Sequence, residues 1–161
     1  MKTAKVFLIL FALSIGMTVK AQDPVFEFVM ELRVKIDQPF SVGKTPKGQR
    51  TVIPITGGTF EGPKLKGEIL SGGADYQLSD EATHRTEVEA IYCIRTDDGV
   101  NIHVRNCGLI TMQEGSFYFV TSPRFEAPKD SKYNFLNNAT FICKPGKPVE
   151  GALSLMIWMV K

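Results

Sequence analysis

Apolar and polar residues alternate one by one along much of the chain, and this pattern restricts the fold more than any other feature. Between Val25 and Ile36 the even positions are apolar, and most odd positions are charged. A period of two is typical of a β-strand with one buried face. The same alternation returns in 86–96 and 100–105, which are joined by Thr96-Asp97-Asp98-Gly99. Because Asp-Gly favours the positive φ angles of tight hairpin turns, we expect a hairpin there.

Further strands are predicted between the turn signals that follow. They cover 49–56, 64–70, 109–112, 116–121, 135–143 and 152–160. No segment shows the 3.6-residue period of a helix, and many strands with short turns are typical of a sandwich or a barrel. The length of the strands favours closure, because a closed sheet has no exposed edges. We therefore expect an all-β fold, a single closed antiparallel β-barrel.

The first residues have the pattern of a secretory signal peptide. Lys2 and Lys5 precede an apolar run from Val6 to Met17, and Val19-Lys20-Ala21 fits a signal-peptidase site. The run is short for a bilayer span. The sequence thus predicts a signal peptide at 1–21, cleavage after Ala21, and one barrel domain at 22–161. The expected location is the periplasm or the outside of the cell, with no stable membrane insertion after cleavage. An uncleaved anchor is the alternative.

Charge and cysteine content exclude some partners and cofactors. The formal net charge is +2, and without Lys2, Lys5 and Lys20 it falls to about −1, so we expect no nucleic-acid partner. Three cysteines, two histidines and no CxxC motif predict neither a metal nor another cofactor. The odd cysteine number leaves at least one thiol free or paired between chains.

The last predicted strand, 152–160, is apolar on both faces. Leu153, Leu155 and Ile157 alternate with Met156 and Trp158. A strand with two apolar faces is usually covered on both. Two explanations are open: this strand forms a homo-oligomer contact, or the N-terminal loop of the same chain covers it.

Several motifs together resemble one known family. They are Gly48-Gln49-Arg50, GGTFEGP (57–63), GGAD (72–75), TDDG (96–99), Asn106 with Gly108, FVTSPRFE (119–126) and YNFLN (133–137). This order and spacing resemble the domain-of-unknown-function family 3237, also called uncharacterised protein family 0311. The resemblance covers the chain after the signal peptide. One departure is Tyr76, where the family pattern has an aromatic residue that is usually tryptophan.

The resemblance implies a closed barrel of the lipocalin or allene-oxide-cyclase kind, with about eight or more strands. It implies no activity. In such a barrel, apolar side chains fill the interior, so a polar residue on the apolar face of a strand is informative.

Seven residues are site candidates. Tyr92, Asn106 and Asn137 share the parity of apolar neighbours on their strands, and Thr59 and Glu61 share the parity of Leu65 and Ile69 across Pro63. Asp75 and Arg124 join them from the resembling motifs. Glu61 and Tyr92 are the catalytic candidates, because a buried carboxylate or phenol can exchange protons. The candidate ligand-binding residues are Arg124, Asp75, Asn106, Asn137 and Thr59.

Structural roles compete with these assignments. Glu61 would cap backbone N–H groups, Arg124 would pair with Glu61 or Asp75, and Asn137 would satisfy a turn. Three functions remain open. The first is binding of a small, mostly apolar molecule inside the barrel. The second is a cofactor-independent isomerase, cyclase or lyase, and the third is a structural or partner-binding module with a filled barrel. Whether the protein is an enzyme stays open at this point.

Overall fold

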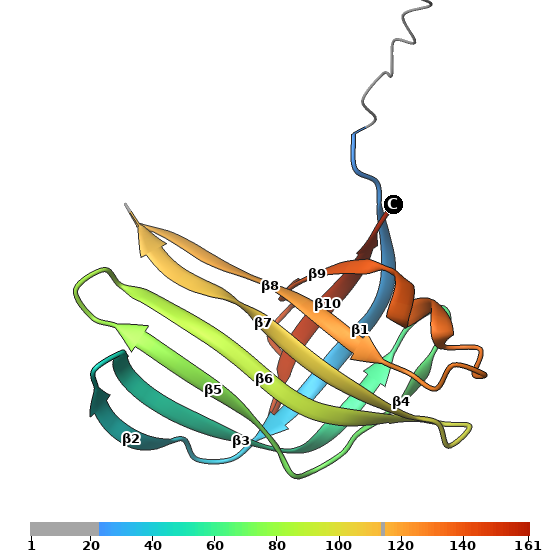
Figure 1. Ribbon diagram of the computed structural model, residues 1–161, viewed down its shortest axis with the longest axis horizontal. Helices are drawn as coiled ribbons and strands as arrows, with labels where there is room; N and C mark the ends of the chain where they lie inside the picture. Colours follow the sequence, from blue (N-terminus) through green and yellow to red (C-terminus); the bar gives the residue numbers. More distant parts are fainter. Residues whose placement is uncertain (1–22, 114) are drawn as a thin grey trace, which may run out of the picture.

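Ten β-strands and one short 3-10 helix make up the part of the chain that the computed structural model describes, residues 23–113 and 115–161 (Figure 1). The predicted signal peptide lies outside these residues. Within them, no helix combines the length and apolarity needed to cross a bilayer. The elements are β1 Phe26–Ile36, β2 Phe40–Thr45, β3 Gly48–Glu61, β4 Lys66–Ile69, β5 Gly73–Asp80, β6 Arg85–Thr96, β7 Asn101–Gln113, β8 Ser116–Glu126, η1 Asn134–Asn138, β9 Thr140–Pro145 and β10 Leu153–Val160.

The strands form one antiparallel sheet that closes on itself. β1 pairs with β10 on one side and with β3 on the other. From β10 the order runs through β9, β8, β7 and β6 to β4 and β5, and both of these also pair with β3. Since β4 and β5 share one place in the ring and β2 only extends β3, the barrel has eight strand positions. This confirms the predicted single closed antiparallel barrel.

Glycines allow strands to approach each other closely in the segment 57–73. Gly58 has a φ of +136°, and a Cβ there would lie 2.1 Å from the carbonyl oxygen of Arg33 on β1. Gly73 opens β5, and a Cβ there would lie 2.5 Å from the Cβ of Tyr92 on β6. A side chain at either place would push neighbouring strands apart. The glycine-rich motifs therefore shape the barrel around β4.

A β-bulge changes the expected orientation of the first strand. The register of β1 with β10 shifts between Phe28 and Met30, and Val29 and Met30 are both buried. A bulge places two residues of one strand opposite one of its partner. On the N-terminal side of the bulge, Phe28 faces outward and packs against Trp158, with 6.2 Å between the ring centroids. The prediction that all even positions of this strand face inward is wrong for Phe26 and Phe28, because the bulge reverses the alternation.

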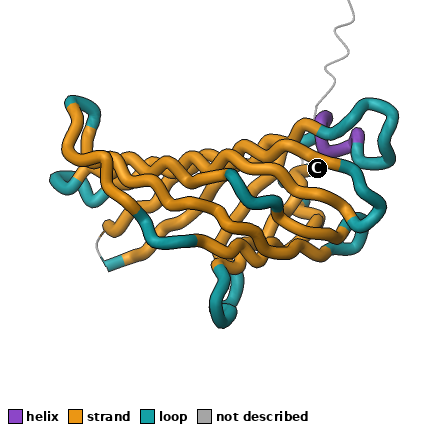
Figure 2. Tube along the Cα trace, turned by 90° about the horizontal axis from the view of Figure 1, so that it is seen from below, coloured by secondary structure: helices purple, strands orange, loops and turns teal. Residues whose placement is uncertain are grey.

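The second departure from expectation is at residues 134–138. The sequence predicts a strand over 135–143, whereas the chain forms the helix η1 before β9 begins at Thr140. Tyr133 and Leu136 turn inward here and are fully buried with Phe141. They close one end of the barrel, where η1 and its loop lie (Figure 2). Tertiary burial of these two side chains therefore overrides the alternating pattern.

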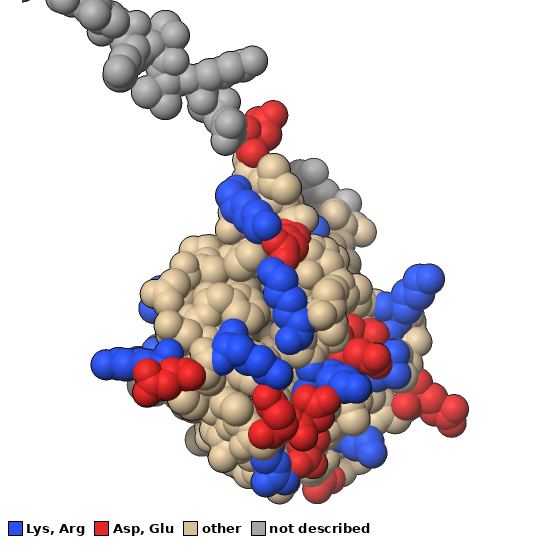
Figure 3. All heavy atoms as spheres, turned by 90° about the vertical axis from the view of Figure 1, so that its right-hand side faces the viewer, with Lys and Arg blue, Asp and Glu red and all other residues tan. Residues whose placement is uncertain are grey.

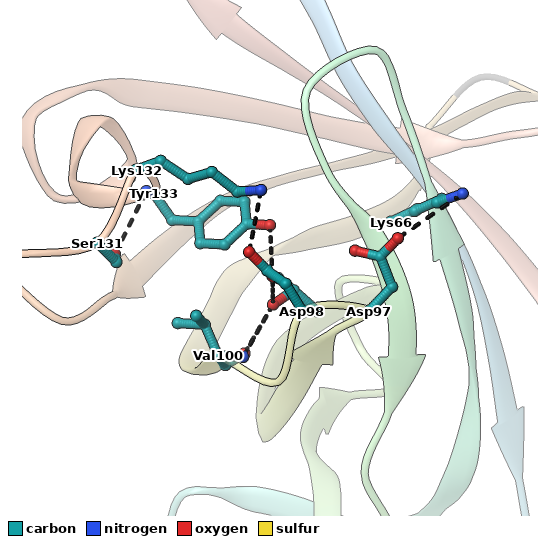
Figure 4. Close-up of polar contacts among 8 residues, drawn as sticks. Lys66, Asp97, Asp98, Val100, Ser131, Lys132 and Tyr133 are labelled. Carbon is teal, nitrogen blue, oxygen red and sulfur yellow. Dashed lines mark hydrogen bonds and ion pairs between the residues drawn. The ribbon is translucent and has the colours of Figure 1, made fainter.

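The carboxylate of Asp98, which we call the acidic hub, connects several segments at this closed end. Asp98, in the β6–β7 turn, accepts hydrogen bonds from Thr96 at 2.5 Å and from Tyr133 at 2.8 Å, and it pairs with Lys132 at 2.9 Å (Figure 4). These partners hold the pKa of Asp98 well below its ordinary range, the Thr96 hydroxyl most strongly. Acidic and basic side chains alternate over the surface of this end (Figure 3). The hub thus fastens the loop before η1 to the β6–β7 hairpin.

Candidate functional site

A cavity of about 100 Å³ lies inside the barrel, toward the end opposite η1. Most of its lining is aliphatic or aromatic and comes from β1, β3, β6, β7, β8 and β10. Ile36 and Leu153 line it and are 48% and 40% exposed, so the cavity reaches the surface beside them. The polar side chains that line it are Asp75, Gln77, Tyr92, Asn106 and Thr121. This part of the interior is therefore open, while the rest is a packed core.

Pairing across four strands explains how some of these polar residues come together. Asp75 on β5 is opposite Ala90 on β6, Ala90 is opposite Asn106 on β7, and Asn106 is opposite Pro123 on β8. Directly opposed residues point to the same face of a sheet. The short side chain of Ala90 leaves space between the carboxylate and the amide. Residues that are far apart in the sequence thus share one row on the inner wall.

Three buried polar atoms in this cavity find no hydrogen-bond partner in the described chain: Tyr92 Oη, Asn106 Oδ1 and Thr121 Oγ1. Each of the three residues is 4% exposed. Leaving a buried polar group unpaired costs about 1–3 kcal/mol, so native proteins rarely do so without a reason. The thiol of Cys143, a weak hydrogen-bonding group, lies beside Asn106 and Thr121. Full partners for the three atoms would come from water or a ligand in the cavity. Burial also raises the pKa of Tyr92, so its phenol keeps its proton at physiological pH.

Asp75 is the carboxylate of the cavity. Its Oδ2 accepts a hydrogen bond from Gln77 at 2.8 Å, and its Oδ1 accepts one from the backbone N–H of Glu89 at 3.1 Å. Burial raises the pKa of Asp75, and these two hydrogen bonds counteract part of the rise. A carboxyl of this kind takes up and releases a proton more readily near neutral pH than an exposed aspartate does.

Cys143 lies on β9 directly opposite Thr121, so its side chain points to the same inner face of the barrel. The thiol is buried, and burial raises its pKa, while Thr121 and Asn106 beside it act in the opposite direction. Cys93, Cys107 and Cys143 are all free thiols. A buried thiol of raised pKa is a poor nucleophile, so Cys143 contributes shape to the wall.

Glu61 and Thr59 do not reach the cavity. Both are exposed on the outer face of β3, where Glu61 is opposite Lys66, and Phe60 takes the inward place. The expectation that they face inward is wrong, because Gly62 and Pro63 turn the chain between β3 and β4. Even residues of β3 therefore oppose odd residues of β4. The catalytic role assigned to Glu61 loses its structural basis.

Arg124 and Asn137 also lie away from the cavity. Arg124 is exposed on the outer face of β8, opposite Arg105, while Pro123 and Phe125 point inward. Asn137 is exposed in η1, where it accepts a hydrogen bond from the Ala127 N–H at 2.8 Å and donates one to the Ala127 carbonyl at 2.9 Å. Neither is placed to contact a ligand inside the barrel. Asn137 instead joins the two ends of its loop by hydrogen bonds to Ala127, which agrees with the structural role in a turn that was the alternative to ligand binding.

Two further residues of the cavity, Thr121 and Gln77, are not among the seven predicted site residues. Thr121 shares the parity of Phe119 and Phe125 on β8, and Gln77 shares the parity of Asp75 on β5. The rule that singled out Tyr92, a polar residue on an apolar face, applies equally to Thr121. Gln77 is harder to find, because 73–80 was not predicted to be a strand.

The fold and this site together define a class of protein: a closed antiparallel β-barrel with a small, mostly apolar cavity and a few inward polar groups. Residues 24–116 match the family described as "Protein of unknown function (DUF3237)". A UPF0311 protein of Clostridium acetobutylicum is 30% identical over 143 residues, which cover 80% of this chain and 89% of the relative. The chain belongs to the DUF3237 family, also called UPF0311.

Two further similarities concern fold and chemistry. A solved β-barrel-like protein of Acinetobacter baumannii superposes with a TM-score of 0.80 at 27% identity, covering 89% of this chain and 99% of that one. A hydroalkoxylation enzyme of Penicillium herquei is 28% identical over 117 residues, covering 73% of this chain and 71% of the relative. The barrel is thus shared with solved proteins, and one relative carries the name of an enzyme.

Proposed function

We propose that the barrel interior binds a small, mostly apolar molecule that carries a polar group. One observation carries this proposal: three buried polar atoms, on Tyr92, Asn106 and Thr121, have no hydrogen-bond partner within residues 23–113 and 115–161, in a cavity whose other walls are largely apolar. Apolar walls supply affinity, and a few polar groups fix the orientation of a ligand. The N-terminal segment supports export, so we propose that the protein meets its ligand in the periplasm or outside the cell.

Binding is tested with ethylbenzene, an apolar probe of suitable size for a small cavity. We expect saturable binding to the wild type by isothermal titration calorimetry. Ala90→Phe, which fills the cavity from its inner wall, should abolish it. Ile91→Phe is the matched control, since it adds the same side chain to the next residue, on the outer face of β6. Equal heats for the wild type and for both variants would refute an internal binding site.

A second candidate function is proton-transfer catalysis without a cofactor, and Asp75 is the observation that favours it. Its carboxyl lies in the cavity with a raised pKa, beside a phenol that keeps its proton. The relative from Penicillium herquei is named for hydroalkoxylation. In that reaction an O–H adds across a C=C bond: a C–O bond and a C–H bond form, and no electrons are lost. An acid–base group such as Asp75 can move the proton.

The enzyme candidate is tested with 2-prenylphenol, whose ring closure to 2,2-dimethylchroman is followed by chromatography. We expect cyclisation above the uncatalysed rate by the wild type. Asp75→Asn should lose most of it, because the amide cannot exchange the proton, typically a loss of about 10²–10⁴-fold. Glu61→Gln, a change on the outer face, should retain the wild-type rate. An Asp75→Asn variant as active as the wild type would exclude the acid–base role.

A further inference from the structure

We infer that the ligand of this cavity is an uncharged hydroxyl compound, an alcohol or a phenol, whose hydroxyl group lies among Tyr92, Asn106 and Thr121. This inference rests on the proposed function, because it names the class of molecule that the barrel interior takes. It follows from two properties of the cavity wall: its hydrogen-bonding pattern and its charge.

The hydrogen-bonding pattern requires a group that both donates and accepts. Asn106 Oδ1 accepts only, so it needs a donor from the ligand. The hydroxyls of Tyr92 and Thr121 each carry a proton to donate, so they need an acceptor. A ketone or an ether accepts without donating. A hydroxyl group donates one hydrogen and accepts up to two, which matches all three unpaired atoms.

Their placement on the sheet brings the three groups to one part of the wall. Tyr92 is opposite Val104 and Asn106 is opposite Ala90, so Tyr92 and Asn106 are diagonal neighbours on β6 and β7. Thr121 is opposite Gly108, which makes it the next diagonal neighbour on β8. Side chains on such diagonals are about 7–8 Å apart at their bases. Asn106 lies in the middle of this diagonal row with Tyr92 and Thr121 at its ends, and all three line the same cavity.

The charge of the wall excludes ionic head groups. Among the described residues that line the cavity there is no lysine, arginine or histidine, so a carboxylate or phosphate would be buried without a counter-charge from them. Asp75 adds repulsion whenever it is ionised. A cation would lose its hydration against mostly apolar walls, and burial disfavours the charged form of Asp75 that would pair with it. A neutral polar group is the one that this wall can hold.

The shape of the cavity orients the ligand. Tyr92, Asn106 and Thr121 are almost fully buried, while the surface opening lies between the apolar side chains of Ile36 and Leu153. The hydroxyl group therefore enters first, and the hydrocarbon part faces the opening. An amphiphile with its polar end exposed would leave the three polar atoms unpaired.

Four probes of similar size test the inference by calorimetry: 4-ethylphenol, ethylbenzene, 4-ethylbenzoate and 4-methylbenzylamine. We expect 4-ethylphenol to bind the wild type about tenfold or more tightly than ethylbenzene, which is the gain from roughly one net hydrogen bond. The two charged probes should bind more weakly than 4-ethylphenol. Equal affinities of 4-ethylphenol and ethylbenzene would overturn the hydroxyl inference and leave the proposed function standing. A charged probe that binds most tightly would overturn it as well.

Matched variants assign the preference to named atoms. Tyr92→Phe and Thr121→Val each remove one hydroxyl and keep the shape, so each should lower the affinity for 4-ethylphenol more than the affinity for ethylbenzene. Because these hydroxyls have no partner in the part of the chain that the structure describes, both variants should melt no lower than the wild type. A clear drop in the melting temperature would mean that the hydroxyls serve the fold, and would contradict the inference. Absence of binding by all four probes would instead count against the proposed function.

Discussion

Asp75 shows how one residue acquires its chemistry from its neighbours in the sheet. Its backbone pairs with Ala90 on β6, and its side chain accepts a hydrogen bond from the backbone N–H of Glu89, 14 residues further along the chain. The neighbouring strand β6 therefore holds Asp75 at the cavity wall. Burial disfavours the charged form of the carboxyl, and the hydrogen bonds favour it. The balance is a raised pKa, which couples the protonation of Asp75 to folding.

The stability of the protein should therefore depend on pH through Asp75. A carboxyl whose folded pKa lies above its ordinary value of 3.8 stabilises the fold below that value, and the contribution is lost as the pH rises through the folded pKa. Asp75→Asn has no such dependence. We expect its melting temperature, relative to that of the wild type, to rise as the pH increases from about 4 through the folded pKa of Asp75.

Asp130→Asn, in an exposed loop, is the control for this experiment, and its melting temperature should follow the wild type at each pH. Thermal unfolding monitored by circular dichroism measures both differences. If the difference in melting temperature between Asp75→Asn and the wild type stays constant with pH, folding does not shift the pKa of Asp75.

At the scale of the elements, the β6–β7 turn holds the loop from Ala127 to Ala139, with its helix η1, in place. The buried ring of Tyr133 reaches into the core, and its hydroxyl donates to Asp98 in the β6–β7 turn. Lys132 pairs with the same carboxylate and lies 5.1 Å from the centroid of the Tyr133 ring. One carboxylate thus connects a hairpin with the loop that closes the barrel (Figure 4).

Replacement of Asp98 by Asn should lower the melting temperature at neutral pH, because the charge that Lys132, Thr96 and Tyr133 stabilise is removed. In the wild type the pKa of Asp98 is lowered, so its contribution is present above its ordinary value of 3.8 and is lost as the pH falls below it. The difference in melting temperature between the wild type and Asp98→Asn should therefore become smaller as the pH falls below about 3.8.

Asp97→Asn is the matched control for Asp98→Asn. It changes the neighbouring residue, whose ion pair with Lys66 is longer, at 3.7 Å, and is exposed. Exposed pairs of this kind contribute little, so the control should melt close to the wild type. If both variants lost the same stability, the hub at Asp98 would have no special role.

At the scale of the whole molecule, one side of the barrel has an apolar outer surface. Trp158 and Phe28 pack edge to face there, and a groove of about 480 Å³ runs beside them, lined by Phe26, Tyr118, Val120, Ile142, Lys144 and Trp158. This is the second apolar face that the sequence assigns to 152–160. Apolar patches of this kind often mark contact surfaces. A homo-oligomer through β10 stays a prediction, with cover by the N-terminal segment as its alternative.

Trp158→Glu separates these explanations. If β10 joins two copies, the wild type should be an oligomer by light scattering, and the charged side chain should convert it to a monomer. Ile91→Glu, a change on the outer face of β6 and therefore away from β10, should leave the mass unchanged. A wild type that is already monomeric over the concentration range would contradict the subunit contact.

Part of this fold and part of this site are predictable from the sequence. Alternation and turn residues predict the strands, and the family motifs predict the closed barrel. Within an unbroken strand the same alternation also identifies Tyr92 and Asn106 as inward, since side chains of a strand point to its two faces in turn. Asp75 came from the motifs alone, and its place in the cavity agrees with that choice.

The tertiary structure decided the rest, because alternation relates residues only within one uninterrupted strand. The turn at Gly62 and Pro63 resets the faces between β3 and β4, which moves Glu61 outward, and burial of Tyr133 and Leu136 turns a predicted strand into η1. The neighbours of a residue across the sheet depend on pairing between distant segments. For this reason the sequence alone determined an all-β chain with inward polar residues. Only the closed barrel brings Asp75, Tyr92, Asn106 and Thr121 together around one cavity.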